Sequence, residues 1–353
     1  MTALRPSTNS GSKYFLSEER DDESKDFRFE LMRIIFMGTP AFAVPTLEAL
    51  INSPYKPSVV VSNPDKPVGK HQILTPPPTK VVAERHGIEV WQPPKLRDPV
   101  LIEQFREFQP EMIIVAAYGK IIPKEIIELP AKGILNVHAS LLPKLRGASP
   151  IQFAILEGHP ETGVTVMQID EELDHGPILA ERSIPIAFGE TFETLHEKLS
   201  KLGAALLLET LPKWLSGEIA PKEQDHSQAT FTKILKKEDG RIDWATSAVH
   251  IERQIRAFHP WPGSWTVWNK KTLKLLFVRL LDSPSIRAGS LEEYGSSLSR
   301  TIAGQVMTKD RRLFIGTGDD ALEILQLQLE GKPAMDAKSF LNGHPEIQGA
   351  KLG

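Results

Sequence analysis

The sequence predicts an α/β protein with two domains, a parallel, doubly wound sheet followed by a small β-barrel. Three observations indicate this. Short β-branched apolar runs alternate with helical patterns through the first part of the chain, which is typical of a parallel sheet. Periodicity fades after residue 217. Beyond it, short strand-like segments at close spacing indicate a barrel, and 353 residues are enough for two cores.

The elements of the first domain follow from their patterns. Runs such as "MRIIFM", "EMIIVAA" and "GVTVMQI" are what buried parallel strands look like, and amphipathic spacing predicts helices between several of them. We expect strands at 32–37, 57–62, 111–117, 133–138 and 163–169. We expect helices at 42–50, 78–86, 99–108 and 191–215, the last ending at "SGE".

The remaining regions are predicted in the same way. The acidic run "SEERDDESKD" has little to bury, so residues 1–31 are expected to be a dispensable tail, and Met32 is a candidate for the true start. The catalytic domain is then 32–217, a linker 218–237 and the C-terminal domain 238–353. That last domain should hold a helix at 247–258 and strands at 264–268, 273–281, 303–308, 312–318 and 321–329.

Composition limits the possible functions. There is no cysteine, which excludes disulfides and thiolate metal sites and fits a reducing cytoplasm. No apolar run is long enough to span a bilayer, and no signal or transit peptide is evident. The net charge is -3, but the part after Lys236 is mildly basic and the part before it acidic. This suits a polyanion-binding appendage on an enzyme, although solvated surface charge explains it equally well.

Polar residues stand in register at one strand end, in "NVHASLLPKLRGASPIQFAI". Asn136 and His138 are two apart on a strand, so they point to the same side, where α/β sheets bind ligands. A carboxylate would be needed to orient the imidazole. The segment "QIDEELDHGPIL" also follows a strand and offers Asp170, Asp174 and His175, and spacing alone does not choose between the two aspartates.

These motifs together resemble the folate-dependent formyltransferases, which carry an Asn-x-His-x-Ser-Leu-Leu-Pro motif and a later Asp-x-Gly motif. The stretches "MRIIFMGTPAFAVPTLEAL", "NPDKPVGK", "VAAYGKIIP", "ETGVTVMQIDEELDHGPIL", "RIDW" and "IRAFHPWPGSW" extend the resemblance from about residue 32 to about 343, in the family's order. The fold this implies is a Rossmann-like formyltransferase domain followed by an OB-like barrel that helps to hold tRNA.

The resemblance also implies an activity and its residues. The donor would be 10-formyltetrahydrofolate, without a metal, and the acceptor the α-amino group of methionine on initiator tRNA. The family's catalytic triad falls on Asn136, His138 and Asp174. Its folate-contacting motif falls on Ser140, Leu141, Leu142 and Pro143. Lys66 and Lys70, in "NPDKPVGK", are the expected tRNA contacts, and we expect a cytoplasmic monomer.

The chain departs from the family at two places. Lys66 stands where arginine is common, which keeps the charge but loses a bidentate fork, so the loop's contact with tRNA is open. His259 stands where asparagine is common, in a turn that we expect to be structural, with packed tryptophans.

Four other functions fit parts of the pattern. A sugar-nucleotide formyltransferase is the main alternative, because it would share the catalytic and folate residues. A folate-dependent hydrolase, with water in place of the amine, and a noncatalytic tRNA-binding protein are weaker. A metal hydrolase using His138, Asp174 and His175 would lack the usual ligand spacing.

Overall fold

A computed structural model describes residues 32–69, 71–281 and 302–353 of the chain. The predicted tail at 1–31 and Lys70 lie outside the described residues. Elements alternate in the first domain as expected: β1 (Ile34–Gly38), η1 (Ala41–Ala43), α1 (Val44–Ile51), β2 (Val59–Val61), β3 (Lys66–Val68), β4 (Ile73–Thr75), α2 (Pro78–Arg85), β5 (Glu89–Trp91), α3 (Pro99–Phe108), β6 (Met112–Ala116), α4 (Lys124–Ile127), β7 (Ile134–His138), β8 (Arg146–Gly147), α5 (Pro150–Leu156), β9 (Glu161–Gln168), β10 (Ile178–Pro185) and α6 (Phe192–Leu215).

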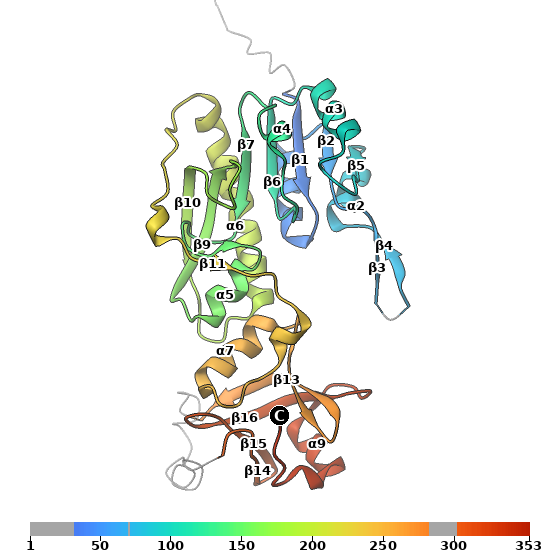
Figure 1. Ribbon diagram of the computed structural model, residues 1–353, viewed down its shortest axis with the longest axis vertical. Helices are drawn as coiled ribbons and strands as arrows, with labels where there is room; N and C mark the ends of the chain where they lie inside the picture. Colours follow the sequence, from blue (N-terminus) through green and yellow to red (C-terminus); the bar gives the residue numbers. More distant parts are fainter. Residues whose placement is uncertain (1–31, 70, 282–301) are drawn as a thin grey trace, which may run out of the picture. The chain divides into compact units, whose positions relative to one another are not determined.

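A seven-stranded sheet organises this domain, in the order β10-β9-β7-β6-β1-β2-β5 (Figure 1). The strands from β7 to β5 are parallel, as the sequence predicts. The expectation of a parallel strand at 163–169 is wrong, because β9 runs antiparallel to β7 and β10 antiparallel to β9. The register of β9 shows its direction. Thr165 lies opposite His138 and Gln168 lies opposite Leu135, so β9 begins near the carboxyl end of β7 and runs toward the start of β7.

Alternate residues of the strands enter two separate apolar layers, as the two-residue period of a strand requires. Ile34, Phe36 and Ile114 pack in a core with α1, α2 and α6. Ile35, Met37 and Ile113 face the opposite way, into a core with α3 and α4. Both faces of the sheet are therefore covered, which confirms the doubly wound prediction.

The C-terminal domain is rich in antiparallel strands, and this also confirms the predicted fold class. An irregular connection precedes it, with η2 (His226–Gln228), β11 (Phe231–Thr232) and η3 (Lys237–Gly240). Its own elements are α7 (Ala248–Phe258), β12 (Ser264–Trp268), β13 (Lys271–Leu280), β14 (Val306–Lys309), β15 (Arg312–Gly316), β16 (Ala321–Leu329), β17 (Met335–Asp336), α9 (Ala337–Gly343) and η4 (Pro345–Ile347). The strands order as β12-β13-β16-β15-β14, and β17 pairs with β16.

Helix α7 takes part in both cores. Its side chains Ile251 and Ile255 lie in the core of the C-terminal sheet. Ala257 and Phe258, at its end, lie in the core beneath α6. The predicted boundary at residues 217 and 238 stays a proposal. No helix in the described ranges has the length and apolar character of a membrane span.

Candidate active site

Two polar side chains of β7 face the layer occupied by α3 and α4. Leu135 and Val137 point into the opposite core, so Asn136 and His138 point away from it, toward the same side as Ile134. His138 is buried, with 6% of its surface exposed, and Asn136 is half-buried. Within the described residues the Asn136 amide has no hydrogen-bond partner, so both of its donors remain free for a ligand.

The hydrogen bond of the His138 ring determines which nitrogen can act. Its Nε2 lies 3.1 Å from the carbonyl oxygen of Leu145. A carbonyl can only accept, so Nε2 carries a proton and donates it. The reactive position is therefore Nδ1, which lies 3.6 Å from Oδ1 of Asp174.

Asp174, and not Asp170, is the aspartate that lies beside His138. Its Oδ2 accepts from the backbone N–H of Gly147 at 2.7 Å, and its Oδ1 faces His138. The carboxylate is largely buried, with 14% exposure. The fixed carboxylate of Asp174 therefore faces the one ring nitrogen of His138 that the Leu145 carbonyl leaves unoccupied.

The reason for expecting Asp174 at this place was only partly right. Because β9 is antiparallel, its carboxyl end lies opposite Leu135, near the start of β7 rather than at its end. The loop after β9 instead folds back over the sheet face: Ile169 packs in the α3–α4 layer and Lys124 pairs with Glu171 at 2.6 Å. That return brings Asp174 to His138.

Asp170 and His175 form a separate pair. His175 Nδ1 lies 2.7 Å from Asp170 Oδ2, and the His175 ring stacks on His226 with centroids 3.9 Å apart. His175 is thus turned to other partners than His138 and Asp174. In the part of the chain that the structure describes, no group of three His, Asp or Glu is arranged to hold a metal ion.

The predicted folate motif forms a tight turn after β7. Ser140 is buried and its hydroxyl donates to the carbonyl of Lys144 at 2.6 Å. Leu142 is buried against Met167 and Ile178. Leu141 and Pro143 are half-buried, so they are the members whose side chains a ligand could reach.

Basic residues mark the predicted tRNA-facing loop. Lys66 is exposed on β3, which pairs with β4 in a hairpin, and Lys70 lies outside the described residues. Lys120, which was not predicted, donates to the carbonyl of Pro93 at 2.9 Å. Partial burial, and then the charge of Lys66, lower its pKa. Two positive charges therefore face the same region.

The turn after α7 fits its predicted structural role only in part. The helix ends at Phe258, and His259 Nδ1 lies 3.2 Å from Oε2 of Glu193. Trp265 is half-buried and donates to the carbonyl of Lys237 at 3.1 Å. The expectation that the tryptophans are packed is wrong for Trp261, which is 56% exposed because the turn carries it out from the core.

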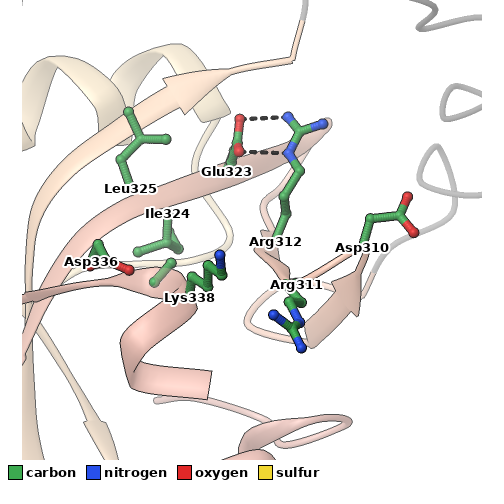
Figure 2. A pocket seen from close by; sticks show the side chains of 9 residues that line it. Asp310, Arg311, Arg312, Glu323, Ile324, Leu325, Asp336 and Lys338 are labelled. Carbon is green, nitrogen blue, oxygen red and sulfur yellow. Dashed lines mark hydrogen bonds and ion pairs between the residues drawn. The ribbon is translucent and has the colours of Figure 1, made fainter. Parts of the chain in front are cut away.

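A hollow of about 350 Å³ lies in the C-terminal domain (Figure 2). Arg311 and Lys338 bring positive charge to it, and Asp310 and Asp336 bring negative charge. Arg312 is tied to Glu323 by two hydrogen bonds of 2.7 Å. The hollow therefore carries both positive and negative charge. Such a lining does not favour an anion, so the hollow is not supported as a phosphate site.

Several groups that shape the site were missed from the sequence. The Leu145 carbonyl and the Gly147 N–H act through the backbone, which leaves no side-chain signature. Arg146 and Gln224 are buried and joined by a hydrogen bond of 2.6 Å, across 78 residues of chain. The one available signal was the basic residue in "KLRGASP" beside the motif, which could have been read as a buried charge in need of a partner.

Comparisons with known proteins agree on both domains. The family described as "Formyl transferase" matches residues 32–211, and "Formyl transferase, C-terminal domain" matches 234–345. A methionyl-tRNA formyltransferase of Halalkalibacterium halodurans is 43% identical, over 88% of this chain and 95% of its own. The methionyl-tRNA formyltransferase of Trichlorobacter lovleyi is 45% identical, over 91% of this chain and 96% of its own.

Solved structures share the fold at low identity. An N-formyltransferase of Helicobacter canadensis, in complex with folinic acid and dTDP-3-aminofucose, is 19% identical with a TM-score of 0.60, covering 83% of this chain and 98% of its own. HypX of Aquifex aeolicus, in complex with tetrahydrofolic acid, is 19% identical with a TM-score of 0.56. That match covers 91% of this chain but only 49% of HypX. At such identities the likeness describes the fold alone.

Proposed function

The chain belongs to the formyltransferase family, and on that premise we propose that it formylates the methionine of initiator Met-tRNA for translation initiation. The observation that carries the proposal is the 41–45% identity to methionyl-tRNA formyltransferases, which extends over 88–92% of the chain. It therefore includes both the catalytic sheet and the C-terminal domain. The sugar-modifying neighbour is only 19% identical and is not favoured.

The donor is a formylated folate, and we assign it as 10-formyltetrahydrofolate. Two structures of the same fold hold tetrahydrofolic acid and folinic acid, and this supports a folate as the class of donor. The turn at 140–143 lies directly after β7, where a bound folate would bring its formyl group to Asn136 and His138. Leu141 and Pro143 are the members of the motif proposed to touch it, since Ser140 and Leu142 are buried.

The chemistry assigns a task to each catalytic side chain. The neutral amine attacks the formyl carbon, a carbon–nitrogen bond forms, and negative charge develops on the formyl oxygen. The free amide of Asn136 donates to that oxygen, and His138 supplies a second donor from Nδ1 when that nitrogen carries a proton. One such donor is typically worth about 2.7–4 kcal/mol. The bond from carbon to the folate nitrogen then breaks, and that nitrogen takes up a proton.

Proton removal from the amine needs no strong base. A free α-amino group titrates at about 8, and esterification of the methionine carboxyl to tRNA lowers that value further, so much of the acceptor amine is neutral at physiological pH. Asp174 orients the ring of His138 and, through water, helps to carry away the amine proton. Because translation starts in the cytoplasm, we propose that location, and the expected monomer stays a prediction.

One assay tests the assignment. Purified protein is given 10-formyltetrahydrofolate with Met-tRNA, with elongator aminoacyl-tRNA, or with a dTDP-amino sugar, and the formylated product of each is measured. We expect formyl-methionyl-tRNA to form far faster than either other product. Formylation of the amino sugar with Met-tRNA untouched would replace this proposal by the sugar-nucleotide alternative.

A further inference from the structure

The segment after α6 runs back across the catalytic domain and contacts both loops of the active site. We name residues 222–232 the strap. It starts with an antiparallel bridge between Lys222 and Ile178, with hydrogen bonds of 2.8 and 2.9 Å. At its other end, β11 pairs in parallel with β8. It is therefore bound into the domain along its length rather than being a free connection.

Gln224 is the centre of the strap. It is buried, with 6% exposure. Its Oε1 accepts from Arg146 at 2.6 Å (Nη2) and 3.2 Å (Nε). Its Nε2 donates to the carbonyls of Asp174 at 3.0 Å and Gly176 at 2.7 Å. A guanidinium only donates and a carbonyl only accepts, so these four bonds fix the orientation of the amide and use its whole capacity.

Arg146 links this amide to the backbone that holds His138. Arg146 is 3% exposed, and its Nη2 also lies 2.8 Å from His226 Nδ1. Its chain neighbours are Leu145, whose carbonyl accepts from His138, and Gly147, whose N–H donates to Asp174. Gln224 thus joins at one point the two loops that hold His138 and Asp174.

Both loops contain a non-glycine residue in the left-handed region of backbone space. Leu145 has φ 59° and Asp174 has φ 47°. Such conformations persist only where the surroundings hold them. The strap supplies a hydrogen bond to each: Thr230 Oγ1 accepts from the N–H of Leu145 at 2.8 Å, and Gln224 donates to the carbonyl of Asp174.

We propose that Gln224 is a positioning residue for formyl transfer. It acts through Arg146 and the Asp174 turn and sets the Asp174–His138 geometry without touching either substrate. This inference rests on the proposed function, but it concerns the site geometry and applies to any acceptor.

Two variants and a matched control test it. Gln224→Leu removes all four bonds. Gln224→Glu has the same shape and keeps the acceptor for Arg146, but it loses both donors to the Asp174 turn. The control is Gln254→Leu on α7, since Gln254 is equally buried at 6% and donates to the carbonyls of Asp239, Gly240 and Arg241.

We expect both Gln224 variants to lower kcat about ten- to hundredfold, since displacements near 1 Å can cost that much. KM for Met-tRNA and for 10-formyltetrahydrofolate should stay within about threefold, because Gln224 faces neither. Gln254→Leu removes only contacts of 3.4–3.5 Å, so it should lower the melting temperature no more than the Gln224 variants do, and it should leave kcat within about twofold.

A second readout does not depend on the acceptor. In protein labelled with ¹⁵N-histidine, the ring signals of His138 should move in both Gln224 variants and stay in place in Gln254→Leu. If Gln224→Leu does not fold, Gln224→Glu decides. Unmoved His138 signals, or a raised KM with unchanged kcat, would overturn the positioning role. A wild-type protein that fails to formylate Met-tRNA would instead refute the proposed acceptor and leave the NMR test standing.

Discussion

Replacing Asp174 by asparagine tests the electrostatic core of the site. The change keeps the size of the side chain and an oxygen that can accept from Gly147. It removes the negative charge 3.6 Å from His138 Nδ1. The pair is largely buried, with 6% and 14% exposure, so screening by solvent is weak.

The expected loss follows from that distance. Two unit charges 3.6 Å apart interact by about 1 kcal/mol in water and by about 5 kcal/mol at an effective dielectric constant of about 20. The site lies between these limits, so we take about 2–4 kcal/mol. Since about 1.4 kcal/mol is a factor of ten in rate, kcat should fall about 30- to 1,000-fold.

The assay is single-turnover formylation of Met-tRNA at saturating donor, with Asp170→Asn as the matched control. Asp170 is five residues from His175 and pairs with it instead of with His138. It is also 37% exposed, so its loss should cost less than about threefold. The reasoning is refuted if the two variants lose activity equally, or if Asp174→Asn stays within threefold of wild type.

Three further changes probe packing, pH and charge. Gly203→Ala on α6 should cost about 1–3 kcal/mol in unfolding free energy, because the new Cβ would lie 2.6 Å from Cγ1 of Val137. The control is Gly343→Ala, whose new Cβ would meet no atom within 4 Å. Equal melting temperatures for the two variants would contradict this. Burial lowers the pKa of His196, so the unfolded chain binds more protons: stability is full above pH 6.5 and falls below it. Urea unfolding across that range should show His196→Leu with a smaller loss at acid pH than wild type, and parallel curves would count against it. Lys66→Ala should raise KM for Met-tRNA several-fold and weaken the dependence of that KM on salt. Lys201→Ala on α6 should do neither. If the salt dependence is unchanged in Lys66→Ala, Lys66 does not contact tRNA.

Local patterns in the sequence were enough to predict the class of fold and most of its elements. The helix predicted at 99–108 is α3 (Pro99–Phe108), and the predicted starts at Thr191 and Ser247 are the capping residues of α6 and α7. These are local properties: amphipathic period, capping side chains and β-branched runs act over a few residues, so they can be read directly from the chain.

That Asn136 and His138 point to the same side of the sheet could also be predicted from the sequence, because a strand places residues two apart on one side. The partner of His138 was not. Asp170 and Asp174 are equivalent by spacing, and the direction of β9 reversed the expected location of their loop. Only the resemblance to formyltransferases favoured Asp174, and the 3.6 Å contact with His138 is what supports it in space.

The contacts that hold the site in place could be seen only in the folded chain. Leu145 and Gly147 act through backbone atoms, and Gln224 meets Arg146 across 78 residues, within a segment that reads as a linker because it has no periodicity. The physical reason is that an irregular segment gains order from hydrogen bonds to distant partners. Such partners are fixed when the chain folds and not by the residues nearby.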